Sequence, residues 1–177
     1  RYQTNNLDAV NWISPGYDDS AWSGPGNGCL YIETDPVAGP LNTPLPAKPG
    51  GGPFNTYYFH TSFVISNVAD VTQLLFSAVV DDGAVFYLNG VEVQRLFMPA
   101  GAVTYATLSA ISHEATSNDV FIVCGDLLTN LVSGTNVLAA EVHQRGLGFG
   151  DHGDPAAARQ LVLRVDAPQR DRGGHEA

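Results

Sequence analysis

The stretch QLLFSAVVDDGAVFYLNGVEVQR, residues 73–95, decides the fold. Its runs 73–80, 84–88 and 91–95 are rich in branched and aromatic residues, which favour β-strands. Asp-Asp-Gly and Asn-Gly separate the runs, and these residue types accept the left-handed backbone angles of tight turns. Asn-Gly between two such runs is the strongest short-range hairpin signal, because a type I′ turn needs positive φ at both central residues. The sequence therefore predicts that 84–88 and 91–95 are antiparallel neighbours.

The run 84–88 is apolar on both of its faces. Side chains alternate along a strand, so Phe86 and Leu88 share one face while Val85 and Tyr87 share the other. This pattern predicts a strand buried inside a sandwich of two sheets.

Two longer runs add strands with defined faces. In 57–65, YYFHTSFVI, every second residue is predicted to face the core, and His60 is predicted to face the opposite side. The core-facing residues are Tyr57, Phe59, Thr61, Phe63 and Ile65. In 137–145, Leu138, Ala140 and Val142 alternate with Glu141 and His143, which predicts one apolar and one polar face. Shorter strands are predicted at 29–33, 120–124 and 160–165.

Two segments between the strands have distinct compositions. Residues 35–53 are rich in proline and glycine, and proline removes backbone donors, so we expect a surface loop outside the central sheet. Residues 125–131 fit one helical turn, which Asp126 can cap and which places Leu127, Leu128 and Leu131 on one side.

Length and charge bound the function. A chain of 177 residues is long enough to bury about 70% of its unfolded surface as one domain. We expect that domain over 1–166, followed by a polar tail or linker at 167–177. The net charge of −10 opposes contact with nucleic acid or anionic membranes, and no apolar run reaches the ~20 residues of a membrane helix. The chain begins at Arg1 without a signal peptide, so we expect a processed product or an excised piece.

The two cysteines leave two interpretations open. Cys29 and Cys124 can pair in an oxidising compartment, or each can be a separate buried thiol.

Four motifs occur in order along the chain. They are Asp18-Asp19-Ser20-Ala21-Trp22, Tyr57-Tyr58-Phe59, residues 81–90, and Gly134-Thr135-Asn136-Val137-Leu138-Ala139 followed by Glu141-Val142-His143-Gln144. In this series the chain resembles the galactose-binding-like jelly-roll modules of bacterial secreted hydrolases and surface proteins. The resemblance covers roughly residues 12–166 and implies an all-β jelly-roll sandwich of two antiparallel sheets, with about eight to ten strands. It also implies a secreted or cell-surface location, whereas the fold alone does not fix a function.

No motif in the chain indicates an enzyme. The pairs Asp18-Asp19 and Asp81-Asp82 lie beside Ser or Gly, so turn formation accounts for them without catalysis. Nucleophile elbows and phosphate-binding loops are missing from the sequence. Structural Ca²⁺ is the one cofactor we consider, with Asp151 and Asp154 as metal ligands in a glycine-rich loop; the alternative is a solvated acidic loop.

Sugar binding requires flat aromatic faces beside planar polar groups. Trp22 and Tyr31 are the candidate aromatic platforms, although Trp22 can equally be a core residue that closes the sandwich. The candidate hydrogen-bonding residues are Glu141, His143, Gln144 and Arg145.

Three functions remain open at this point. The first is a non-catalytic carbohydrate-binding or accessory module of a secreted or surface protein. The second is a structural or assembly subunit of a fibre, surface layer or virus particle, in which the proline-rich loop and the N-terminal arm contact neighbouring copies. The third is a fragment of a hydrolase whose active site lies elsewhere.

Overall fold

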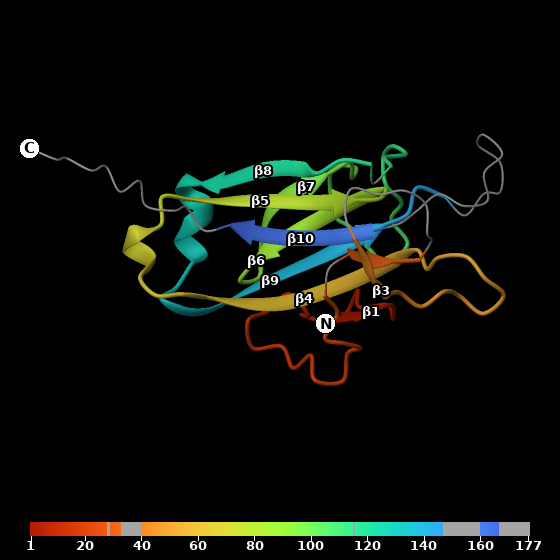
Figure 1. The fold of residues 1–177 in the computed structure, drawn as a ribbon, viewed down its shortest axis with the longest axis horizontal. Helices are drawn as coiled ribbons and strands as arrows, with labels where there is room; N and C mark the ends of the chain where they lie inside the picture. The colour runs from red at the N-terminus through yellow and green to blue at the C-terminus, as the bar shows by residue number, and fades with distance from the viewer. Residues whose placement is uncertain (28, 33–39, 115, 147–159, 167–177) are drawn as a thin grey trace, which may run out of the picture.

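Two five-stranded sheets packed face to face form the protein in the computed structural model, which describes residues 1–27, 29–32, 40–114, 116–146 and 160–166 (Figure 1). The predicted all-β sandwich is confirmed. Sheet A has the order β1 (Tyr2–Gln3), β4 (Thr56–Ile65), β9 (Gly134–His143), β6 (Gly83–Leu88) and β7 (Val91–Leu96). Sheet B has the order β3 (Leu41–Pro44), β2 (Cys29–Tyr31), β10 (Gln160–Asp166), β5 (Gln73–Val80) and β8 (Asp119–Cys124).

The Asn-Gly hairpin forms as predicted. Strands β6 and β7 are antiparallel, with Leu88 opposite Val91. Asn89 has φ 48° and Gly90 has φ 88°, so both central residues of the turn take the left-handed angles that a type I′ turn requires.

The Asp81-Asp82 turn has a different role from the Asn-Gly turn. Strand β5 belongs to sheet B and β6 to sheet A, so this corner carries the chain between the sheets (Figure 1). The buried Asp82 carboxylate fixes the corner: Oδ2 accepts a hydrogen bond from the Arg145 amide at 2.8 Å, and Oδ1 accepts one from the His113 amide at 3.3 Å. The turn therefore joins the two layers of the sandwich.

The predicted alternation of strand faces places the main core between the sheets. Phe86 and Leu88 lie in this core, as do Leu138, Ala140 and Val142 of β9. On β4 the inward set is buried at both ends of the strand, but Thr61, predicted to face the core, is exposed. The other main inward residues are Tyr57, Phe59, Ile65, Leu74, Phe76, Ala78, Val80, Phe121 and Val123.

A second apolar cluster covers the outer face of sheet A. It consists of Leu7, Trp12, Trp22, Tyr58 and Ala139. The N-terminal segment, red in Figure 1, thus packs on the outer face of sheet A. Its strand β1 belongs to the same sheet and pairs with β4 through Tyr2 and Gln3.

The proline-rich segment is partly a strand. Within its described residues, β3 pairs in parallel with β2 at the edge of sheet B, so the prediction of a loop throughout was wrong for 41–44. Position is the reason: an edge strand needs ladder hydrogen bonds on one side only, and therefore tolerates the proline at its end.

The predicted helical turn is the 3₁₀ helix η2 (Gly125–Asn130); a second one, η1, spans Val68–Asp70. Asp126 lies in the first turn of η2 but its side chain makes no capping hydrogen bond there. Leu128 and Leu131 pack on the core, whereas Leu127 is exposed, because three leucines cannot share the narrow inward side of a 3₁₀ turn. Among the described helices, none has the length and apolar character to cross a membrane.

Cys124 is a free, exposed thiol at the end of β8. The interpretation of Cys124 as a buried thiol was therefore wrong, because alternation along β8 directs it outward. The structure assigns it no disulfide.

Candidate functional site

Strand register assembles polar side chains on the outer face of sheet A. In β4 and β9, Thr56 is opposite His143 and Tyr58 is opposite Glu141. In β9 and β6, Glu141 is opposite Val85. Since side chains alternate, these residues point to the same face, away from the core between the sheets. They begin a row that continues onto β7.

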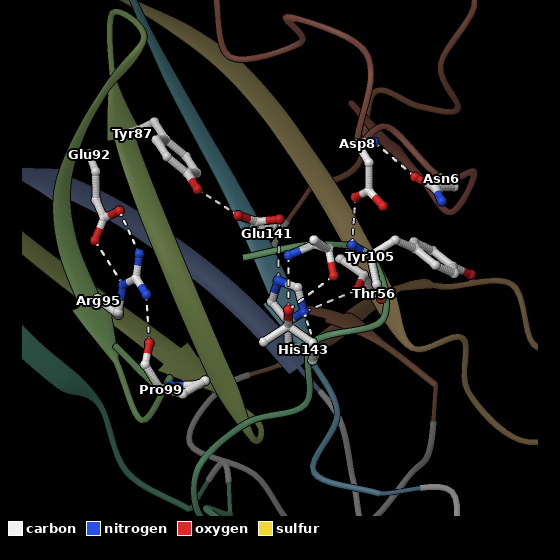
Figure 2. A network of polar contacts seen from close by, with 12 residues as sticks. Asn6, Asp8, Thr56, Tyr87, Glu92, Arg95, Pro99, Tyr105, Glu141 and His143 are labelled. Carbon is white, nitrogen blue, oxygen red and sulfur yellow. Dashed lines mark hydrogen bonds and ion pairs between the residues drawn. The ribbon is translucent and has the colours of Figure 1, made fainter. Parts of the chain in front are cut away.

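A β-bulge extends this row. The β6–β7 register shifts between Phe86 and Tyr87, so that Tyr87 pairs with Glu92 while Val85 pairs with Arg95. Without the shift, residues 92 and 95 would face opposite sides of the strand; with it, both lie on the outer face. We define the polar row as Thr56, His143, Glu141, Tyr87, Glu92 and Arg95 (Figure 2).

At the β7 end of the polar row, Arg95 and Glu92 form a bidentate ion pair. Arg95 Nε and Nη2 lie 2.9 and 2.8 Å from the two carboxylate oxygens of Glu92. The Glu92 hydrogen bonds raise the pKa of Arg95 above its ordinary value. Nη1 donates to the carbonyls of Pro99 at 2.6 Å and Gly101 at 2.9 Å, so Arg95 also holds the chain that follows β7.

In the middle of the row, the Tyr87 hydroxyl donates to Glu141 Oε1 at 2.5 Å (Figure 2). Burial raises the pKa of Tyr87, and the nearby charge of Glu141 raises it further. The same two causes, in the same order, raise the pKa of Tyr58. Both phenols therefore stay protonated, and Tyr87 donates its hydroxyl hydrogen to the Glu141 carboxylate.

At the β4 end of the row, His143 is fully buried, with 0% of its surface exposed. Its Nδ1 lies 3.0 Å from Thr56 Oγ1 and 2.8 Å from the carbonyl oxygen of Thr107. Its Nε2 lies 3.2 Å from Glu141 Oε2. Glu141 itself is only 6% exposed, so this half of the row is sealed from solvent.

Two segments cover the polar row. Trp12 packs edge-on against Tyr58 and Tyr87, with ring centroids 4.9 and 5.7 Å away. Residues 97–110, which we call the covering segment, pass over Gly83 and reach His143. Glu92, 40% exposed on its side chain, and the half-buried Tyr87 form the accessible end of the row.

The structure brings together two of the six predicted ligand-binding residues, Glu141 and His143. Gln144 is fully buried, and its side-chain amide has no hydrogen-bond partner among the described residues. Arg145 is exposed and donates from its guanidinium to the Ala110 carbonyl at 3.2 Å.

The two predicted aromatic platforms lie elsewhere. Trp22 is 7% exposed and packs against Trp12 and His60, so its ring has no free face. This packing agrees with the interpretation of Trp22 as a core residue. Tyr31 is in β2 of sheet B, in the opposite layer from the polar row. The hypothesis of sugar stacking on Trp22 does not fit this packing.

Tyr87, Glu92, Arg95 and Thr56 were missed as site residues. The alternation of residues 84–88 already placed Tyr87 opposite the core face, so the sequence held a usable signal for it. Glu92 and Arg95 carried none, because alternation separates them and only the bulge unites them.

The calcium prediction stays a prediction. Asp151 and Asp154 lie outside the described residues. Within the described part of the chain, no group of three or more His, Cys, Asp or Glu side chains is arranged to hold a metal ion.

No protein-family model matches this chain, and no curated protein matches its sequence. The solved structures similar to it include three that each cover most of this chain. They are a β-glycosidase from Bacteroides vulgatus (15% identity, 90% of this chain and 18% of that chain, TM-score 0.48), a Bacteroides uniformis β-glucuronidase (14%, 93% and 18%, 0.49) and a glycosyl hydrolase family 2 member from Bacteroides cellulosilyticus (13%, 94% and 19%, 0.49). This chain spans less than a fifth of each of those chains, and the likeness concerns the fold alone.

Proposed function

We propose that this chain is a non-catalytic carbohydrate-binding module of a secreted or cell-surface protein, with the accessible end of the polar row as its sugar contact. The observation that supports it is the grouping of Glu92, Arg95 and Tyr87 on one face through the β7 bulge. Sugar hydroxyls pair with carboxylate and guanidinium groups, and sugar C–H faces pack on phenol rings.

The contacts inside the polar row support binding rather than catalysis. A general acid or base must come within hydrogen-bond reach of the substrate. Glu141 and His143 are instead buried against each other. Glu141 also contacts Tyr87, and His143 also contacts Thr56. The accessible groups, Glu92 and Arg95, already neutralise one another. This pairing suits an uncharged ligand.

A glycan array followed by affinity electrophoresis tests the proposal. We expect retardation in a gel containing the array-selected neutral polysaccharide. Glu92→Ala should weaken binding about tenfold, because it removes a charged hydrogen-bonding group at the accessible end. Glu114→Ala, at another exposed carboxylate, is the matched control and should leave retardation unchanged. Absence of binding to every glycan, or equal loss in both variants, contradicts the proposal.

One observation favours a second candidate, an assembly module. Strand β8 is an edge of sheet B, and Val120 and Ile122 are 62% and 54% exposed on it. Exposed apolar edge strands are templates for pairing with another chain. The N-terminal arm is already packed on sheet A, so the β8 edge is the surface that we propose for contact with another copy. Gel filtration distinguishes the candidates: a monomer argues against assembly, and a large oligomer favours it.

A further inference from the structure

Two side chains of the polar row hold the covering segment by its backbone. Arg95 donates to the carbonyls of Pro99 and Gly101 at one end. His143 contacts the carbonyl of Thr107 near the other end. Each is backed by a carboxylate, Glu92 behind Arg95 and Glu141 behind His143 (Figure 2). The same order of carboxylate, nitrogen base and backbone carbonyl thus occurs twice.

The neighbours of His143 assign the proton on its Nδ1. The Thr107 carbonyl, 2.8 Å away, can only accept a hydrogen bond. Thr56 Oγ1 donates its own proton to the Tyr105 carbonyl at 2.7 Å, so it presents a lone pair to the ring. With two acceptors in front of it, Nδ1 carries a hydrogen.

The remaining ring nitrogen then faces a carboxylate. Nε2 lies 3.2 Å from Glu141 Oε2, at ion-pair distance but off the direction of a hydrogen bond, and has no other partner among the described residues. If His143 were neutral, this nitrogen would turn a lone pair toward the oxygen in a buried site, which is repulsive. A proton on Nε2 makes the contact attractive.

The contact of Glu141 with Tyr87 shows which partner holds that proton. Their O–H···O distance is 2.5 Å, in the range of about 2.5–2.7 Å for an ionised acceptor. Glu141 thus accepts from Tyr87, and we assign the proton of the Nε2 contact to His143. The pair consists of an imidazolium and a carboxylate.

We propose that the covering segment is fastened to sheet A by one permanent contact, through Arg95, and one pH-sensitive contact, through His143. Arginine stays charged at every pH that a folded protein meets, whereas histidine changes charge near neutrality. When His143 loses its Nε2 proton, Glu141 repels the ring, and the Thr107 end of the segment loosens. The Pro99–Gly101 end stays in place.

The ionisable side chains nearest the pair are three phenols and an arginine, and Asp8 lies beyond them, where it accepts from the Tyr105 amide at 2.6 Å. Tyr87 faces the pair from β6, Tyr58 from β4 and Tyr105 from the covering segment; burial raises the pKa of all three phenols, so they stay neutral. Arg95 faces Glu141 from β7 and stays cationic. The proposal therefore assigns the change of charge to His143, and the His60 variant below tests the other histidine on this face.

An NMR titration of the ¹⁵N-labelled chain tests the proposal. Long-range ¹H–¹⁵N spectra report the protonation of both ring nitrogens of His143, and amide spectra report the covering segment. We expect the Thr107 and Ser109 amides to shift with the same midpoint as His143, while Gly101 does not. Local opening at Thr107 should rise about tenfold on deprotonation, the change expected when a charge-assisted contact is lost. An unprotonated Nε2 in the closed state, or Thr107 and Ser109 amides that ignore the titration, overturns the proposal.

Two variants sharpen the test. His143→Gln cannot carry the charge, so its covering segment should be loosened at every pH. The control is His60→Gln on the same face of sheet A: His60 pairs with Asp19 at 2.8 Å and packs against Tyr17 and Trp22, so the transition at Thr107 should persist. A transition that survives in His143→Gln, or vanishes in His60→Gln, contradicts the proposal. If His143→Gln does not fold, the wild-type titration decides alone.

Discussion

Gly83 lies directly beneath Ser109. A Cβ atom at position 83 would lie 2.9 Å from Cβ of Ser109 and 2.8 Å from Sδ of Met98, closer than a Cβ atom approaches other heavy atoms in folded proteins. Gly83 is also opposite His143 in the sheet. The missing side chain at position 83 therefore leaves the space through which the covering segment reaches the polar row.

Gly83→Ala should destabilise the protein by about 1–3 kcal/mol, the usual cost of an extra carbon in a filled site. Met98 can move its flexible end, but the Cβ of Ser109 is tied to backbone and cannot. The measurement is urea unfolding followed by tryptophan fluorescence. Gly16→Ala is the control, since the added Cβ would come no closer than 4.0 Å to a neighbour. Equal midpoints for the two variants would show that the covering segment is not packed on Gly83.

The alternation on the β5–β8 pair predicts a sharp contrast between two truncations. Leu74 is completely buried in the core, whereas Ile122 points outward from the neighbouring strand. Leu74→Ala should cost about 2–5 kcal/mol because it leaves a cavity. Ile122→Ala should stay within about 0.5 kcal/mol, as expected at an exposed site. Thermal unfolding at low protein concentration measures both, and a large loss from Ile122→Ala would instead reveal a surface that another chain covers.

The buried phenols predict a loss of stability in alkali. Burial, reinforced by Glu141, raises the pKa of Tyr87 and Tyr58 above the ordinary tyrosine value of about 10, so the folded state keeps protons that the unfolded chain releases. Stability from these groups is present below about pH 10 and falls as the pH rises above it. Tyr87→Phe removes one such group, so its unfolding free energy should fall less steeply between pH 9 and about 11.5. If the unfolding free energies of wild type and variant fell equally steeply with pH, the pKa of Tyr87 would not be raised by folding.

The sequence predicted the features that local chemistry determines. Asn89-Gly90 specified a turn through backbone angles that few other residues accept, and the alternation around Phe86 and Leu138 specified which face is buried. These signals span only a few residues. They were sufficient for the hairpin, the sandwich and the placement of Glu141 and His143 on one face.

Features that depend on contacts distant in sequence were not predictable in the same way. The bulge that brings Glu92 beside Arg95 appears only when β7 is aligned with β6. Trp22 and Tyr87 look alike in sequence as aromatic residues near polar ones, but the packing of Trp12 and His60 decides that Trp22 is covered. Likewise the Asp81-Asp82 turn gave no sign of changing sheets, because a turn and a crossover use the same residue types.

Asn89 combines a left-handed turn with three side-chain hydrogen bonds, and glycine can separate the two roles. Its Nδ2 donates to the Asn130 carbonyl at 2.6 Å and to Asn136 Oδ1 at 2.8 Å, while its Oδ1 accepts from the Val137 amide at 2.7 Å. Asn89→Gly keeps a residue suited to the φ of 48° but removes all three bonds. We expect a loss of about 1–3 kcal/mol, because partners around the buried Asn136 are left without hydrogen bonds.

Asn89→Ala completes that comparison, because it removes the same bonds but, unlike glycine, keeps a β-carbon in the left-handed region, without the polar group that lets asparagine tolerate that conformation. The added strain is about 1–2 kcal/mol, so the order of stability should be wild type, then Asn89→Gly, then Asn89→Ala. Denaturant midpoints at a shared m-value measure the order. If Asn89→Gly were as stable as the wild type, the contribution of Asn89 to stability would come from the turn angle alone. If the Gly and Ala variants were equally stable, that contribution would come from the hydrogen bonds alone.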